Sequence, residues 1–176
     1  MWRGSLLHIN DSDGSEKGVS DMKVLFVDVD GVLIPAAQHL VDPMCSLDRN
    51  IPNMTVAVLN KICEITDARV VMNTVHNTDR ENTPSIYDAM VSAGFKPEYF
   101  YPEHYKTDYP NLRRSRAVVS WLQTHGDDVT DWACIDDTEC ATTEHMLLID
   151  SDIGLNIHYA NDLLTRWNHT PMMFML

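Results

Sequence analysis

The sequence has no pair of cysteines in CxxC spacing. Its four cysteines are Cys45, Cys63, Cys134 and Cys140. We interpret them as free thiols of an intracellular chain, with a catalytic cysteine as the less favoured alternative.

The chain also lacks a long hydrophobic run. No apolar stretch approaches the roughly 20 residues that a membrane-spanning helix needs, and residues 1–21 lack the apolar core of a secretory signal. We therefore expect a cytoplasmic protein that does not interact with membranes. Residues 1–21 are rich in Ser, Gly and Asp, which predicts a flexible N-terminal arm. The length of the remainder, 22–176, suits a single domain.

Positive charge is scarce. The chain has 26 acidic against 13 basic residues, a formal net charge of −13. Such a balance argues against broad electrostatic binding to nucleic acid. If the substrate is an anion, a bound cation and a few local basic residues must reverse the field at the site.

The most informative stretch is KVLFVDVDGVLIP, residues 23–35. The apolar run Val24 to Val27 predicts a strand buried on both faces, as in a parallel sheet. Asp28 and Asp30 follow at its carboxyl end, where ligands bind in open α/β sheets. Two acids there are costly to bury unless a cation or a proton offsets their charge.

Further elements alternate along the chain. We expect strands at 68–72, 132–135 and 145–149, and helices at 54–66, 83–93, 114–125 and 159–167. Asn53 is the expected N-cap of the first helix, and Gly94 the residue after the second helix. The segment 34–53 is expected to be a loop with a short turn or hairpin. This alternation predicts an α/β protein, a three-layer α/β/α sandwich with a mainly parallel sheet.

Several motifs resemble the haloacid dehalogenase (HAD) superfamily, whose members are mostly phosphatases. DVDGVL, beginning at Asp28, is similar to the family's first motif, and WACIDD, ending at Asp136 and Asp137, to its fourth. RSRAVVSWL, beginning at Arg114, is similar to the helix that carries the third. The resemblance implies a Rossmann-like sheet. Only about 20 residues separate the first motif from the next helix, so residues 22–176 would form a small HAD-like catalytic domain without a sizeable cap (C0-like).

The resemblance also implies catalytic roles. Asp28 would be the nucleophile that forms an aspartyl-phosphate, and Asp30 the general acid and base. Mg²⁺ would be held by Asp28, Asp136 and the backbone carbonyl of Asp30, with Asp137 binding directly or through water. Without a cation, four converging carboxylates would repel one another strongly.

Other motif positions are less regular. Thr74, which closes the second strand, resembles the family's second motif, and with Asn73 it would bind phosphoryl oxygens. Small members of the family read Ser-Ser-x-Trp-Arg here, whereas this chain has Asn73, Thr74, Val75, His76 and Asn77, and so lacks the arginine. The basic residue of the third motif would be Arg114, which would act in catalysis and in binding substrate, with Arg116 as a further substrate ligand. Arg116 and Lys106 remain alternatives for Arg114's role.

We therefore predict a Mg²⁺-dependent phosphatase that hydrolyses a phosphomonoester, which is a nucleotide, another small phosphate or a nucleic-acid end. The alternative is a catalytically weak binding or regulatory protein that keeps the fold and the metal site. His76, His104 and His145 are not expected to be catalytic. The aromatic segment 95–109 is expected to pack in the core, with base stacking as the alternative. The apolar tail, PMMFML, would pack on the core or on another copy of the chain in a homo-oligomer.

Overall fold

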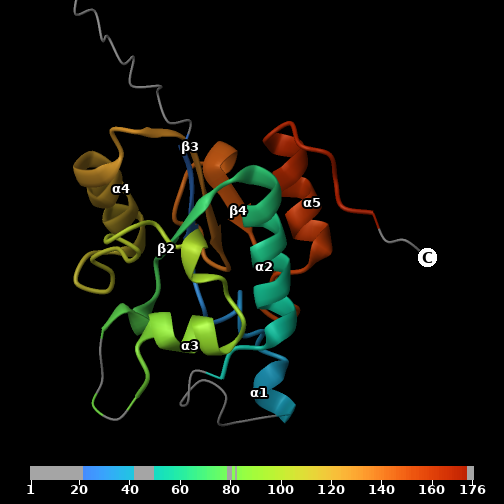
Figure 1. Cartoon of the computed structure of the whole chain (residues 1–176). Helices are drawn as coiled ribbons and strands as arrows, with labels where there is room; N and C mark the ends of the chain where they lie inside the picture. The colour runs from blue at the N-terminus through green and yellow to red at the C-terminus, as the bar shows by residue number, and fades with distance from the viewer. Residues whose placement is uncertain (1–21, 42–49, 79–80, 82, 174–176) are drawn as a thin grey trace, which may run out of the picture.

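Four parallel strands form the centre of the fold, in the order β2-β1-β3-β4 (Figure 1). The computed structural model describes residues 22–41, 50–78, 81 and 83–173. The strands are β1 Met22–Val27, β2 Arg69–Met72, β3 Val129–Asp136 and β4 Met146–Leu148. The predicted α/β architecture with a parallel sheet is confirmed. In this sheet the carboxyl ends of β1, β2 and β3 lie at one edge.

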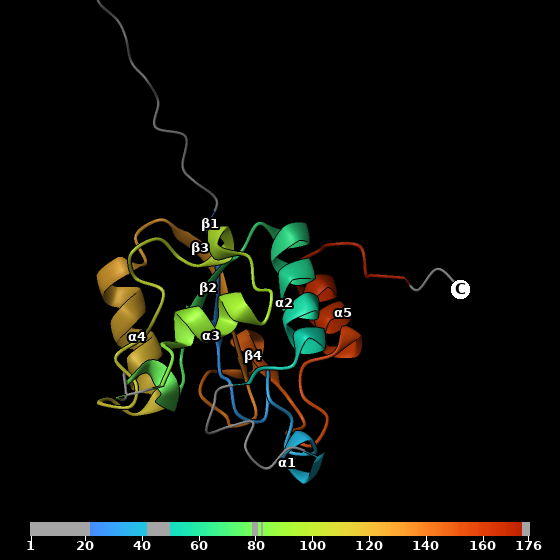
Figure 2. The ribbon, with the colours of Figure 1, turned by 60° about the horizontal axis from the view of Figure 1, so that its bottom comes forward.

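Helices cover both faces of the sheet and complete the expected three layers. They are α1 Gln38–Val41, α2 Asn53–Thr66, α3 Ile86–Ser92, α4 Arg114–His125 and α5 Ile157–Arg166. Figures 1 and 2 show α4 on one side of the sheet and α2 and α5 together on the other. Alternate residues of β1 point to opposite faces. Leu25 and Val27 join the core with α2, α3 and α5, while Val24 and Phe26 pack against α4.

Helix and strand boundaries differ from the expected ones by a few residues. Helix α3 begins at Ile86 because the Ser85 hydroxyl accepts a hydrogen bond from the Asp88 amide and caps the helix. The N-cap prediction for α2 was wrong. Asn53 is the first helical residue, and the N-cap is Pro52, whose side chain makes no capping bond. The expected loop at 34–53 contains α1 in its described part.

The aromatic segment packs along the free edge of β2. The amide of Tyr101 donates to the carbonyl of Val70, and Met72 exchanges backbone bonds with Tyr105 and Thr107. The rings of Phe95 and Phe100 are buried in the main core, and Tyr99 and Tyr105 pack against it. This segment therefore contributes to the core and the sheet edge, the interpretation favoured above.

Some sequence expectations fall wholly or partly outside the described residues, among them the N-terminal arm 1–21 and Cys45. Of the tail, Met172 hydrogen-bonds through its backbone to Asn161 of α5 and packs on the core. The three cysteines that the structure describes are buried free thiols. None of the described helices is both long and apolar enough to cross a membrane.

Trp121 joins α4 to the sheet and provides a test of this packing. Its ring packs edge to face against the ring of Phe26, with the two centroids 5.3 Å apart, and its Nε1 donates to the carbonyl of His104 at 2.9 Å. We expect Trp121→Ala to lower the free energy of unfolding by about 3–5 kcal/mol. Trp121→Phe, which keeps most of the ring but loses the hydrogen bond, should cost about 1–3 kcal/mol.

Urea unfolding followed by circular dichroism would measure both changes. The control is Val119→Ala on the same helix, because half of the Val119 side chain is exposed. Equal stabilities for Trp121→Ala and the control would contradict this account of the α4 layer.

Candidate active site

Two buried carboxylates lie side by side where β1 and β3 end. Val27 is paired with Ile135 in the parallel register, so Asp28 and Asp136 occupy equivalent positions one residue later. Their exposed fractions are 2% and 1%. Because side chains alternate along a strand, both carboxylates point to the face that α4 covers. The sheet register thus brings together two acids that are far apart in the sequence.

Arg114, the first residue of α4, links these two carboxylates. Its Nη1 lies 2.7 Å from Asp28 Oδ2, makes a second, shorter contact with Asp136 Oδ1, and is 3.8 Å from Asp137 Oδ1. The guanidinium also lies over the ring of Tyr109, 5.1 Å from its centroid. Arg114 therefore occupies the place expected for the basic residue of the third motif. Its catalytic role stays a prediction.

Each carboxylate leaves one oxygen without a protein partner. Asp28 Oδ1 and Asp136 Oδ2 are buried and unpaired, and so is Asp30 Oδ1. Carboxylate oxygens of Asp28, Asp136 and Asp137 all lie within 4.8 Å of one another. Mg²⁺ prefers oxygen ligands and is commonly held by one or two carboxylates plus water and phosphate. The donor set and its unpaired buried oxygens therefore fit this ion.

Burial and neighbouring charge act in opposite directions on these groups. Burial raises the pKa of Asp28, although Arg114 lowers it. Burial, followed by the nearby charge of Asp28, raises the pKa of Asp136 to about 7. Burial alone would lower the pKa of Arg114, but Asp28 and Asp136 raise it above its ordinary value. The arginine therefore stays charged and offsets part of the cost of two buried acids.

A tight turn after β1 brings Asp30 and Asp137 close to this pair. Gly31 has a φ of +77°, a conformation that favours glycine, and its amide donates to the carbonyl of Ile34 at 2.8 Å. A Cβ atom at Gly31 would lie against the Asp137 carboxylate, 2.8 Å from its Cγ. Glycine is thus required both for the turn and for the close approach of Asp137.

Asp30 differs from the two buried acids because its carboxylate is partly exposed and bonded to a histidine. His76 Nε2 lies 3.0 Å from Asp30 Oδ2, and the exposed fractions of the two side chains are 8% and 43%. The hydrogen bond to His76 is the main reason why the pKa of Asp30 is lowered. Sequence reasoning did not assign His76 to the site. The one signal was its position in the segment that departs from the family pattern.

The end of β2 supplies the polar residues expected there. Thr74 is fully buried, and its hydroxyl accepts a hydrogen bond from the His76 amide. Asn73 is 1% exposed; its Oδ1 accepts a bond from the Thr107 hydroxyl, and its Nδ2 is unpaired. Asn77, which stands in place of the family's arginine, donates to the carbonyls of Met72 and Thr107.

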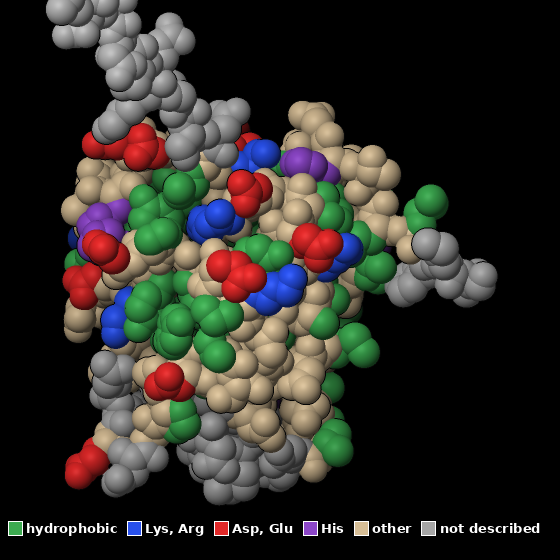
Figure 3. All heavy atoms as spheres, viewed as in Figure 1, with side chains coloured by type: hydrophobic (Ala, Val, Ile, Leu, Met, Phe, Trp, Pro, Cys, Tyr) green, Lys and Arg blue, Asp and Glu red, His purple; other side chains and the backbone are tan. Residues whose placement is uncertain are grey.

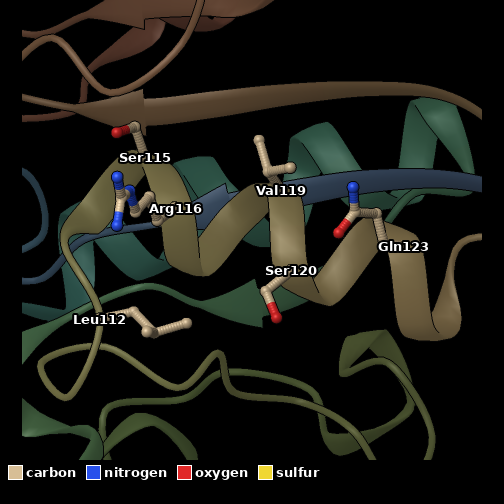
Figure 4. Close-up of a pocket in the computed structure, with 6 residues that line it drawn as sticks. All are labelled: Leu112, Ser115, Arg116, Val119, Ser120 and Gln123. Atoms are coloured by element: carbon tan, nitrogen blue, oxygen red, sulfur yellow. The ribbon is translucent and has the colours of Figure 1, made fainter.

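The two alternative basic residues lie elsewhere. Arg116 is exposed and lines a hollow along α4 with Leu112 and Val119 (Figure 4). Lys106 Nζ donates to the carbonyl of Asn77 at 3.2 Å. Among the described basic residues, Arg114 is the one that forms ion pairs with Asp28, Asp136 and Asp137. The predicted role of Arg116 in binding substrate stays untested.

The comparisons with known proteins identify one family. Residues 24–160 match a family model described as the HAD domain in Swiss Army Knife RNA repair proteins. The match includes every residue placed at the site above. No curated protein and no solved structure matches the chain.

The raised pKa of Asp136 predicts how the stability of the metal-free protein changes with pH. The folded protein holds this proton up to about pH 7, whereas the unfolded chain releases it near 3.8. Between these values the folded state binds more protons, so the contribution of Asp136 to stability falls as pH rises. Asp136→Asn removes this loss. Between pH 4 and pH 7, the free energy of unfolding of the variant should rise by on the order of 1–3 kcal/mol relative to that of wild type.

Urea unfolding in EDTA at several pH values would measure this difference. Asp28 and Asp30 titrate in both proteins, and the charge of Asp28 contributes to the Asp136 shift, so the difference from wild type reports Asp136 together with its coupling to Asp28. Asp127→Asn, at an exposed position, is the matched control. A stability difference between Asp136→Asn and wild type that stays constant over this range would show that the Asp136 carboxyl is not shifted.

Proposed function

Because the chain belongs to the family of HAD domains in Swiss Army Knife RNA repair proteins, we propose that it is a Mg²⁺-dependent phosphatase acting through an aspartyl-phosphate on Asp28. The observation that supports this most is the state of Asp28. One of its oxygens is held by Arg114, and the other is buried and unpaired within the acidic cluster. A carboxylate held in this way can bind the cation through one oxygen while the other attacks phosphorus.

In the proposed reaction, one oxygen of Asp28 attacks phosphorus and forms an O–P bond. The ester P–O bond breaks, and its electron pair goes to the leaving oxygen, which takes a proton from Asp30. Water then attacks the phosphorus of the aspartyl-phosphate and gives its proton to Asp30. The O–P bond to Asp28 breaks, which releases inorganic phosphate and restores both carboxyls.

The cation would be held by Asp28, Asp136 and Asp137. When bound, it neutralises charge on the phosphoryl oxygens and keeps the nucleophile ionised. Arg114 contributes a fixed positive charge beside Asp28 and is positioned to donate to a phosphoryl oxygen. The unpaired Nδ2 of Asn73 and the backbone of Thr74 are further donors at the end of β2. The anionic phosphate itself raises the pKa of a nearby carboxyl, which favours the protonated Asp30 that the first step needs.

For the substrate we propose a phosphorylated RNA end, because RNA repair is named in the description of the family. The predicted lack of a cap fits a polymer end, which needs an open site. On the face shown in Figure 3, the described basic side chains lie among acidic ones and form no continuous basic surface. With a net charge of −13, recognition would therefore depend on the terminal phosphate and few neighbouring nucleotides. A free nucleotide or another small phosphomonoester is the alternative substrate.

A second candidate is a binding or regulatory protein with the same metal site and weak turnover. Asn77 favours it, because this residue replaces an arginine of the family pattern and uses its amide for internal hydrogen bonds. The two activity and metal experiments below distinguish the candidates. Metal-dependent stabilisation without turnover would favour the binding protein.

The first prediction concerns Asp28. With Mg²⁺, wild type should hydrolyse 4-nitrophenyl phosphate and 3′- or 5′-phosphorylated oligoribonucleotides. Asp28→Asn should lower kcat/KM by at least about 10³-fold, because the amide is a poor nucleophile. Asp127→Asn serves as the control for the loss of one surface charge. Equal activity of Asp28→Asn and wild type would remove the proposed mechanism.

The second prediction concerns the ion and does not require turnover. Mg²⁺ should raise the Tm of wild type, and EDTA should reverse the shift. At a Mg²⁺ concentration of 100 times Kd, binding stabilises the folded state by about 2.7 kcal/mol. Asp137→Asn should weaken the shift through lost charge, and Gly31→Ala by pushing the Asp137 carboxylate aside. Asp150→Asn, at an exposed loop position, is the control. A Tm that does not respond to Mg²⁺ in wild type would exclude this metal site.

A further inference from the structure

Asp30 and His76 form a contact that joins the loops after two different strands. Asp30 follows β1, His76 follows β2, and His76 Nε2 lies 3.0 Å from Asp30 Oδ2. His76 as a whole residue is 6% exposed. A buried polar ring of this kind is held by its surroundings and has few alternative positions.

The backbone around His76 is fixed from both sides. His76 lies in the short helix η1, Val75–Asn77, whose N-cap is Thr74. The hydroxyl of Thr74 accepts a hydrogen bond from the amide of His76. On the other side, the Asn77 amide group donates to the carbonyls of Met72 and Thr107. The histidine is therefore anchored to the end of β2 and to the segment along its edge.

Asp30 is less enclosed than the other two acids of the site. Its side chain is 43% exposed, in contrast to Asp28 and Asp136, which are almost fully buried. A partly exposed carboxylate on a turn can occupy several rotamers, and holding it in one has an entropic cost. The other charged groups that act on Asp30 are His39, from α1, and Arg114. The contact of His76 Nε2 with the Asp30 carboxylate is a hydrogen bond of 3.0 Å.

The contact treats the two oxygens of Asp30 differently. Oδ2 is bonded to His76, whereas Oδ1 is buried and has no partner. We propose that His76 is a positioning residue for Asp30: its bond to Oδ2 fixes the orientation in which the carboxyl protonates the leaving oxygen and then takes a proton from water. This inference rests on the proposed phosphatase function and adds to it a residue to which the resemblance assigns no catalytic role. His76 and Asn77 stand where small members of the family have Trp and Arg. In the proposal both serve Asp30, because Asn77 anchors the short helix η1 and His76 holds the Asp30 carboxylate.

The proposal predicts a specific dependence on the leaving group. In the first step, the P–O bond breaks and negative charge develops on the leaving oxygen, which the proton from Asp30 neutralises. A 4-nitrophenolate leaves with little need for that proton, whereas the alkoxide of benzyl phosphate requires it. Loss of correct positioning should therefore affect the benzyl ester more. A residue that supports only the fold would affect both esters equally.

The experiment compares kcat/KM for 4-nitrophenyl phosphate and benzyl phosphate, two esters of similar size. This parameter reports the steps up to formation of the aspartyl-phosphate. His76→Ala should lower kcat/KM for the benzyl ester at least about tenfold more than for the nitrophenyl ester. His76→Gln, which can donate from a similar position, should restore the ratio to within about threefold of wild type. His158→Gln, on the exposed side of α5, is the matched control.

A double-mutant cycle tests whether the effect passes through Asp30. In an Asp30→Ala background, adding His76→Ala should leave the ratio of the two kcat/KM values unchanged, because the acid is already absent. Equal losses on both esters for His76→Ala in an active enzyme would overturn the positioning role while leaving the phosphatase function intact. So would a ratio that His76→Ala shifts further in the absence of Asp30.

A wild type that cleaves neither ester would instead overturn the phosphatase function, and with it the catalytic role of His76. The contact itself is then read by NMR of the full chain. A slowly exchanging Nε2 proton of His76 that disappears in Asp30→Ala would show the hydrogen bond in solution. Its absence from wild type, or its persistence in Asp30→Ala, would overturn the contact as well.

Discussion

The site depends on the guanidinium of Arg114, which lies between two buried carboxylates. Asp28 and Asp136 end neighbouring parallel strands, and the sheet register leaves them side by side with almost no access to water. Arg114 meets both, which offsets part of the repulsion and desolvation of the two charges. A basic residue at a helix N-terminus opposes the macrodipole, and here the two acids compensate for that placement.

The rest of the site is arranged around this ion pair by backbone geometry. Gly31 allows the tight turn after β1 and the close approach of Asp137. The short helix η1 after β2 places His76 next to Asp30. Arg114 holds one oxygen of Asp28 and one of Asp136, and His76 one oxygen of Asp30, so that each acid presents a second, unpaired oxygen. Three acids with separate environments can thus take different roles, although all arrive from the ends of two strands of one sheet.

Much of this architecture could be predicted from local sequence patterns. The continuous apolar run before Asp28 identified a buried strand, and the helix over 114–125 has the expected bounds. Prediction failed where several residues compete for one local role. Pro52 precedes α2 where Asn53 was the expected cap, and α3 starts late because Ser85 binds the Asp88 amide. Such outcomes depend on backbone angles that neighbouring elements impose.

By itself, the sequence determined the order of the strands and helices along the chain and the acidic residues that end β1 and β3, because hydrophobic runs and their polar ends are local properties. The tertiary structure alone decided that Arg114, among three candidate basic residues, meets the carboxylates, since only sheet register and helix packing fix distances across 86 positions of the chain. The same holds for His76 and Asp30, which are 46 positions apart. Nothing local to either residue distinguishes that pair from two ordinary loop residues, because their contact arises from the parallel pairing of β1 with β2.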